Sequence, residues 1–262
     1  ESSDPHRRYV ASPLASLPQP HRSTAGFKEL LRASQTGANS KAEVLAAVPA
    51  EVNRFVLDAL FERPVQAKLV ELLLLQQGDR DFTSCVLVHG MGGTGKTVTA
   101  VAAVQDRAVR RHMSNIYWLT VGADAVGERI LALQAMLYKQ LTGKGMQDEE
   151  AKDEHERQGL LVAAMAEKQR SLLVLDDPWM PEQVRCFNPI DGSQTEHRLL
   201  VTTRIRDLVP KATRVELPLM GKDEAVALLL ELANVTEIYY LKEHPELTWP
   251  PPAAYSIASE CG

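Results

Sequence analysis

The stretch Gly90-Met-Gly-Gly-Thr-Gly-Lys-Thr97 decides the fold, because it matches the pattern G-x-x-x-x-G-K-[ST]. It follows a short apolar run at 85–89, typical of a buried strand, and precedes a helical pattern over 97–113. Glycines let the backbone curl so that successive amides point at phosphate oxygens, and a helix N-terminus favours anions. The alternative is an ordinary glycine-rich turn before a helix. We predict a phosphate-binding loop whose nucleotide-binding residues are Gly90, Met91, Gly92, Gly93, Thr94, Gly95, Lys96, Thr97 and Val98.

Two residues of this loop are predicted to act in the chemistry. Lys96 would place an ammonium on the β- and γ-phosphates of a nucleotide, and the Thr97 hydroxyl would ligate Mg²⁺. The loop alone does not separate an ATPase from a kinase, a GTPase or a transporter subunit.

A second motif, Leu172-Leu-Val-Leu-Asp-Asp177, narrows the choice. An apolar strand that ends in a carboxylate brings that group beside the phosphates at the carboxyl edge of a parallel sheet. We expect Asp176 to hold Mg²⁺, directly or through water, and Asp177 to orient or deprotonate an attacking water. The alternative is that the two aspartates cap the helix that follows.

A third motif, Leu199-Leu-Val-Thr-Thr-Arg204, ends another apolar strand. From that position Arg204 can reach a γ-phosphate and report its presence, since a guanidinium matches phosphate geometry. The alternative is a surface arginine after a strand, and Arg206 is a weaker candidate for the same role. Tyr117, Trp118 and Trp179 are interpreted as packing aromatics.

Strands and helices alternate from residue 85 onward, which predicts an α/β fold with a parallel sheet covered on both faces. The expected strands are 85–89, 116–121, 171–175, 198–203 and 214–217. One helix is expected over 97–113, and Asp124 is expected to cap the next, which Gly143 ends. A further helix over 223–233 should turn four side chains inward, namely Ala225, Leu228, Leu229 and Leu232.

The chain divides into three predicted parts. Residues 1–50 form a poorly ordered or helical lead-in, residues 51–220 a P-loop nucleotide-binding domain, and residues 221–262 the beginning of an incomplete helical subdomain. Helical patterns are also expected over 27–75. Because the first residue is Glu1 rather than methionine, we expect a piece of a longer chain.

Composition limits the function classes. The 262 residues carry a net charge of −5, so no basic field favours nucleic acid as a partner. No apolar run approaches the ~20 residues of a membrane-spanning helix, and we expect no membrane partner. The three cysteines are widely spaced, which fits a reducing compartment and a cytoplasmic location.

Taken in order, the motifs GMGGTGKT, YWLTVG, LLVLDDPW, LLVTTR and VELPLMGKDEAVALLLELA resemble the NB-ARC family of STAND-type P-loop ATPases. This family includes plant disease-resistance proteins and the apoptosome scaffold. The resemblance implies a P-loop three-layer sandwich with a five-stranded parallel sheet, in which the sensor strand lies between the P-loop strand and the Asp-Asp strand. It also implies N-terminal helices and the start of a C-terminal helical subdomain.

The resemblance adds a site for adenine. A segment upstream of the P-loop wraps the adenine in relatives, and Phe61 and Arg63 occupy that place here, although an ordinary helix start is the alternative. Pro178 departs from the family pattern, in which an aliphatic residue is usual. The chain ends before the family's G-L-P-L motif.

Three functions remain open. The first is an ATP/ADP-binding molecular switch with slow Mg²⁺-dependent hydrolysis, in which Lys96, Asp177 and Arg204 act catalytically. Its partners would be an adenine nucleotide, neighbouring domains of a longer chain and other copies of the chain in the ATP state. The second is a motor ATPase of the AAA+ kind, and the third is an interaction module that binds nucleotide without hydrolysing it.

Overall fold

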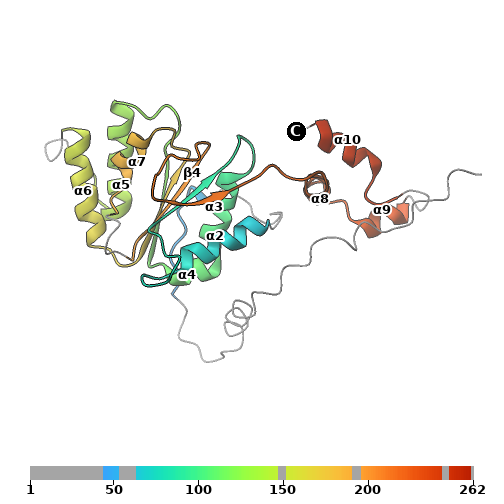
Figure 1. Cartoon of the computed structure of the whole chain (residues 1–262), viewed down its shortest axis with the longest axis horizontal. Coiled ribbons are helices and arrows are strands. Elements are labelled where there is room, and N and C mark those ends of the chain that lie inside the picture. Colours follow the sequence, from blue (N-terminus) through green and yellow to red (C-terminus); the bar gives the residue numbers. More distant parts are fainter. Residues whose placement is uncertain (1–43, 53–62, 147–151, 191–195, 244–247, 261–262) are drawn as a thin grey trace, which may run out of the picture. The chain divides into compact units, whose positions relative to one another are not determined.

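The computed structural model describes residues 44–52, 63–146, 152–190, 196–243 and 248–260. One sheet has the strand order β2-β3-β4-β1-β5, with all neighbours parallel (Figure 1). Its strands are β1 (Cys85–His89), β2 (Asn115–Thr120), β3 (Ser171–Asp176), β4 (Arg198–Thr203) and β5 (Thr213–Glu216). The predicted five-stranded parallel sheet is confirmed, with strand ends shifted by at most one residue.

The strand order has a direct consequence for the motifs. β4, which ends in the predicted sensor motif, pairs with β1 on one side and with β3 on the other. The P-loop strand and the Asp-Asp strand therefore both neighbour it. This is the arrangement that the family resemblance implied.

Helices cover both faces of the sheet (Figure 1). One face carries α2 (Pro64–Leu74), α3 (Lys96–Gln105) and α4 (Arg107–His112). The other carries α5 (Glu128–Thr142), α6 (Glu154–Ala166) and α7 (Pro181–Phe187). Alternate strand residues supply the two cores: Val86 and Val88 pack toward the first face, Cys85 and Leu87 toward the second. The result is the predicted three-layer sandwich.

The prediction of one helix over 97–113 is wrong, because the helix is interrupted at Asp106. The backbone of Asp106 has φ −55° and ψ 132°, which no α-helix can continue. Its carboxylate accepts hydrogen bonds from the amides of Ala108 (2.7 Å) and Val109 (3.2 Å). Asp106 is therefore the N-cap of a separate helix, α4. Here a local side-chain cap decides where the helix begins, although the apolar pattern of the sequence continues through it.

The predicted cap at Asp124 is also wrong. Helix α5 begins after Gly127, whose φ of 51° lies in the left-handed region, and no side chain caps it. Asp124 instead forms an exposed ion pair with Arg129 at 3.4 Å. The C-terminal end agrees with expectation, since the left-handed Gly143 donates its amide to the carbonyl of Lys139.

Three helices follow the sheet, namely α8 (Lys222–Leu232), α9 (Glu237–Glu243) and α10 (Pro252–Glu260). The buried residues of α8 are Val226 and Leu230, which cluster with Ala254 of α10. The predicted inward face is partly wrong: Leu229 packs against this cluster, but Leu232 is 64% exposed. Residues 225–230 are apolar almost all round the helix, so their spacing alone could not select the face that α10 covers.

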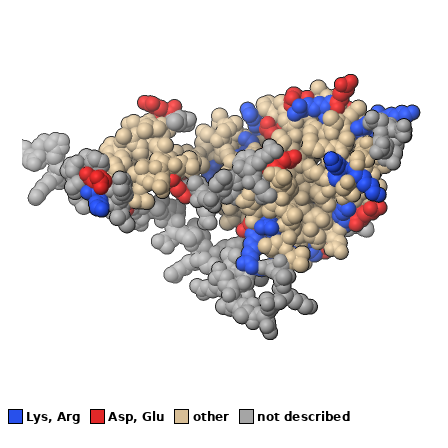
Figure 2. Space-filling model, turned by 180° about the vertical axis from the view of Figure 1, so that it is seen from behind, with Lys and Arg blue, Asp and Glu red and all other residues tan. Residues whose placement is uncertain are grey.

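Part of the N-terminal prediction lies outside the described residues. The helical pattern at 27–31 and most of that at 52–60 fall there. Residues 44–49, expected to be helical, are not. Among the helices that the structure describes, none combines the length and apolar character needed to cross a membrane. On the face in Figure 2, Lys and Arg side chains are interspersed with Asp and Glu side chains.

Candidate functional site

The loop between β1 and α3 has a backbone that only glycine accommodates easily. Gly93 and Gly95 have φ values of 80° and 91°, in the left-handed region, and Gly95 directly precedes the first turn of α3. A Cβ on Gly90 would lie 2.4 Å from the carbonyl oxygen of Leu217. Glycines are therefore required both for the curl of the loop and for its close approach to the segment after β5.

Lys96 lies folded against this loop and is 8% exposed. Its Nζ donates to the carbonyl oxygens of Gly90 (3.0 Å) and Met91 (2.6 Å). Burial, and to a smaller extent Arg204, lowers the pKa of Lys96, while the carboxylates of Asp177 and Asp176 act in the opposite direction. The ammonium is thus held at the loop by two carbonyls that a phosphate oxygen could replace.

Thr97 and Asp176, the two predicted Mg²⁺ ligands, are in contact across the site. The Thr97 hydroxyl donates to Asp176 Oδ1 at 2.8 Å, and the Thr202 hydroxyl donates to the same oxygen at 2.6 Å. Burial raises the pKa of Asp176, and the charge of Asp177 adds to this rise, whereas the two hydroxyls oppose it. A hydroxyl and a carboxylate in contact form a donor set that fits Mg²⁺, which prefers oxygen ligands and keeps several of its waters.

Asp177 has an unusual backbone. Its φ is 57°, a left-handed value that is uncommon for a residue with a side chain. Its amide donates to the carbonyl oxygen (2.9 Å) and the hydroxyl (3.1 Å) of Thr202, which hold this conformation. Its Oδ2 accepts a hydrogen bond from the indole N–H of Trp179 at 3.1 Å. The two adjacent aspartates therefore use different neighbours, and neither caps the following helix α7, which begins at Pro181.

Arg204 follows β4 and reaches the P-loop. Its Nη1 would lie 3.1 Å from a Cβ on Gly92. On another side the guanidinium carbon is 5.0 Å from the centre of the Trp179 ring. Arg204 is exposed and lines the cavity beside the P-loop, and its role as a phosphate sensor stays a prediction.

The three motifs line one cavity of about 440 Å³. Its walls come from the P-loop and α3, from the ends of β2, β3 and β4, and from Gly122. The lining residues are Gly92, Gly93, Gly95, Lys96, Thr97, Val98, Thr120, Gly122, Asp176, Asp177, Thr202 and Arg204. Gly90 and Thr94 support the loop from behind, and the Met91 side chain is 66% exposed.

Of the two predicted adenine residues, the structure describes one. Phe61 lies outside the described residues. Arg63 is 8% exposed, and its guanidinium donates to the carbonyl oxygens of Thr94 (3.1 Å) and Pro218 (2.9 Å). It also lies 4.0 Å from Glu224 of α8. Arg63 therefore joins the back of the P-loop to the segment between β5 and α8.

Sequence analysis missed two site residues. Thr202 belongs to a predicted strand, yet its hydroxyl donates to the Asp176 carboxylate and accepts from the Asp177 amide. Trp179, interpreted as a packing aromatic, contacts both Asp177 and Arg204. The only signal for Trp179 in the sequence was its position two residues after the second aspartate.

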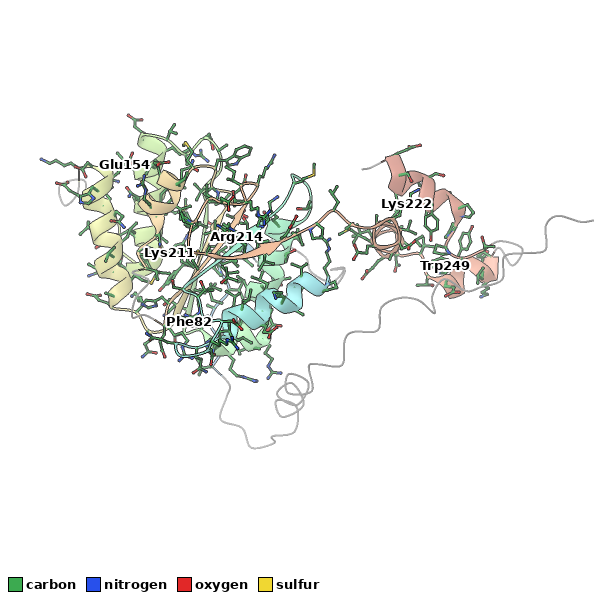
Figure 3. All side chains as sticks on the ribbon, viewed as in Figure 1. Phe82, Glu154, Lys211, Arg214, Lys222 and Trp249 are labelled. Carbon is green, nitrogen blue, oxygen red and sulfur yellow. The ribbon has the colours of Figure 1, made fainter. Side chains whose placement is uncertain are left out.

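A larger hollow of about 630 Å³ lies between α6 and α7. Its walls are side chains of both helices, among them Glu154 (labelled in Figure 3), His155 and Cys186. Glu154 and Glu182 bring negative charge to this hollow, and the Asp153 carboxylate already accepts from two of the first amides of α6, so it suits a phosphate less well than the smaller cavity does.

Comparison with known proteins agrees with this geometry. The model of the NB-ARC domain matches residues 64–238. Apoptotic protease-activating factor 1 of Danio rerio is 30% identical over 207 residues, which are 76% of this chain and 15% of the relative. A disease resistance protein of Arabidopsis thaliana is 28% identical over 136 residues, or 52% of this chain and 15% of that one.

A solved structure of the Orc1 protein of Aeropyrum pernix aligns with a TM-score of 0.46 at 15% identity, covering 71% of this chain and 52% of that one. The chain spans about 15% of the length of the two sequence relatives above. The family model covers well over half of the chain and includes all three motifs of the cavity. The chain therefore belongs to the NB-ARC family of P-loop NTPases.

Proposed function

We propose that this chain is an ATP/ADP-binding molecular switch that hydrolyses ATP slowly with Mg²⁺. The observation that carries the proposal is the 2.8 Å contact between the Thr97 hydroxyl and Asp176, in the cavity that also holds Lys96 and Arg204. These groups come from three segments far apart in the sequence. Their convergence supplies a polyphosphate with an ammonium, a guanidinium and a pair of metal ligands.

Binding of the triphosphate would exchange contacts that the loop now makes with itself. Phosphate oxygens would replace the carbonyls of Gly90 and Met91 as partners of the Lys96 ammonium. Thr97 and Asp176 would hold Mg²⁺, which neutralises charge on the phosphates when bound. A cation beside Asp176 also favours its ionised form, against the effect of burial on its pKa.

Hydrolysis needs a water in line with the γ-phosphate. We assign Asp177 to orient that water and to accept its proton, with Oδ1 as the accepting atom because Oδ2 is bound by Trp179. The water oxygen forms a bond to the γ-phosphorus, the bond from that phosphorus to the bridging oxygen breaks, and ADP and phosphate leave. Arg204 would stabilise the charge on the transferred group.

Switching requires that the two nucleotides favour different states. Arg204 would contact a γ-phosphate that only ATP has, and Arg63 would connect the P-loop to Pro218 and α8. The partners that receive the signal would be neighbouring domains of a longer chain, and other copies of the chain in the ATP state.

The test combines retained nucleotide with turnover. Denatured chain should release ADP, identified by chromatography, and fresh Mg·ATP should be hydrolysed slowly. Asp177→Asn should keep ATP affinity and lower the rate about a hundredfold, the size of a general-base contribution. Asp207→Asn is the matched control, since Asp207 is exposed and pairs with Arg214 away from the cavity lining.

Each other outcome points to another function. Nucleotide-induced stabilisation without phosphate release over hours would favour an interaction module. Fast turnover that rises with protein concentration would favour a motor. Absence of any nucleotide binding would overturn the assignment of the loop.

A further inference from the structure

Trp179 occupies a position that its initial interpretation as a packing residue does not explain. It is half-buried and lies two residues after the proposed water-orienting Asp177. Its indole contacts two charged groups of the cavity at once, the carboxylate of Asp177 and the guanidinium of Arg204. A side chain needed only for packing would not require either contact.

The fully buried side chain of Gln183 holds the backbone at Trp179 through hydrogen bonds. The Gln183 side-chain oxygen accepts from the amides of Trp179 (2.6 Å) and Met180 (3.1 Å). Its side-chain nitrogen donates to the carbonyls of Gly122 (3.2 Å) and Ala125 (3.0 Å). The segment that carries the indole is therefore tied to the loop after β2, one wall of the cavity.

The ring N–H then fixes the orientation of the Asp177 carboxylate. The Nε1 to Oδ2 hydrogen bond is 3.1 Å long, and the left-handed backbone at Asp177 is held by Thr202. With its backbone and one oxygen both held, the carboxylate has a single remaining oxygen for water. Fixing a reacting group in this way removes orientational freedom that would otherwise slow the chemical step.

The ring face supports Arg204. A guanidinium 5.0 Å from the ring centre lies within the range of a cation–π interaction. This contact holds the guanidinium beside Gly92, at the P-loop. The same indole thus constrains the proposed base through its edge and the proposed sensor through its face.

We infer that Trp179 is a positioning residue that sets both the Asp177 carboxylate and the Arg204 guanidinium for the γ-phosphate. The inference rests on the proposed function and extends it. It makes water orientation and γ-phosphate sensing depend on one side chain, through two separable contacts.

Two substitutions separate these contacts. Trp179→Phe keeps a ring face for Arg204 and removes the N–H, so kcat should fall about tenfold while KM for ATP stays within about twofold. Trp179→Leu removes the ring face as well. Its preference for ATP over ADP, measured as a ratio of dissociation constants, should be about threefold lower than that of Trp179→Phe. Trp249→Phe is the matched control, because Trp249 packs with the C-terminal helices (Figure 3) and should leave both values unchanged.

A double-mutant cycle excludes a merely structural effect. If Trp179 acts through Asp177, then Trp179→Phe should lower the rate in the wild-type background and cause no further loss in the Asp177→Asn background. Likewise, Trp179→Leu should not change the ATP/ADP ratio once Arg204 is replaced by Met. Equal losses in both backgrounds would show general damage to the fold and overturn the inference.

The failure of this inference differs from that of the proposed function. A wild-type chain that hydrolyses ATP and prefers it over ADP, with both Trp179 variants unchanged, rejects only the role of Trp179. If the wild type binds ATP without hydrolysis, the ATP/ADP ratio decides the role of Trp179 by itself. A wild type without nucleotide binding rejects the proposed function and the inference together.

Discussion

The two edges of the sheet each bury a cation, but they hold it in different ways. At the carboxyl edge Lys96 is 8% exposed and lines the cavity, where it donates to two carbonyls of the P-loop that a ligand could replace. At the amino edge Arg198 is 1% exposed, and its guanidinium stacks on the ring of Phe82, with 4.1 Å between the guanidinium carbon and the ring centre. Phe82 is labelled at this edge in Figure 3.

The partners of Arg198 are permanent parts of the fold. Its guanidinium donates to the carbonyls of Leu75, Glu196 (3.4 Å) and His197 (3.1 Å), which joins the end of α2 to the start of β4. Its Nε has no hydrogen-bond partner among the described residues. Burial lowers the pKa of Arg198 to about 10, so the group stays charged at neutral pH.

The comparison teaches that burial alone does not identify a functional cation. What distinguishes the two groups is access and the nature of the partners. Lys96 faces a cavity and could exchange its partners for phosphate, whereas Arg198 is enclosed by groups that cannot leave. One edge should therefore govern ligand binding and the other stability.

The largest expected effect is at the amino edge. Arg198→Ala leaves three backbone carbonyls without their donor and a cavity under Phe82, so the free energy of unfolding should fall by about 3 kcal/mol. Urea denaturation followed by circular dichroism measures this. Arg198→Lys keeps the charge but lacks the planar fork, so an intermediate loss is expected. The ATP-induced increase in stability should persist in both variants; its loss would show that the two edges are coupled.

The next effect is at the carboxyl edge. A nucleotide at about a hundred times its Kd raises the free energy of unfolding by about 2.7 kcal/mol, and Lys96→Ala should remove this increase. Without nucleotide the variant should be about as stable as the wild type, because it loses a buried charge together with its hydrogen bonds. Thermal melting with and without Mg·ATP measures both. An unchanged nucleotide shift would contradict the assignment of the P-loop.

Most of the sheet and the three motifs could be predicted from sequence, for a physical reason. Strands β1 to β4 each carry a short apolar run because both of their faces are buried, and each motif stands where such a run ends. The carboxyl ends of parallel strands meet at one edge, so Lys96, Asp176 and Arg204 were expected together and are found lining one cavity.

The features that could not be predicted depend on single local contacts. The break at Asp106 results from one carboxylate capping two amides inside a sequence that is otherwise helical. The hydrogen bonds of Arg63 are to backbone carbonyls, and every residue has a carbonyl, so the identity of its partners could not indicate them. The place of Trp179 depends on the left-handed backbone of Asp177 and on the buried Gln183.

The smallest expected effect is the pH dependence of stability at the amino edge. The amide of Ser171 donates to His197 Nδ1 at 3.2 Å, which requires that nitrogen to be unprotonated. Burial, and less strongly Arg198, lowers the pKa of His197 below its ordinary 6.5, while Glu196 opposes this. The unfolded chain therefore binds the proton more readily, so stability is complete above pH 6.5 and is lost as the pH falls through the lower folded value. The loss cannot exceed about 1.4 kcal/mol per pH unit for one proton.

The variant His197→Asn, whose side-chain oxygen can still accept from Ser171, tests this assignment. Between pH 7.5 and 5.5 its urea midpoint should change less with pH than that of the wild type, by on the order of one proton's contribution. His155→Asn, on the exposed side of α6, is the control, and an equal flattening there would contradict the assignment to the amino edge.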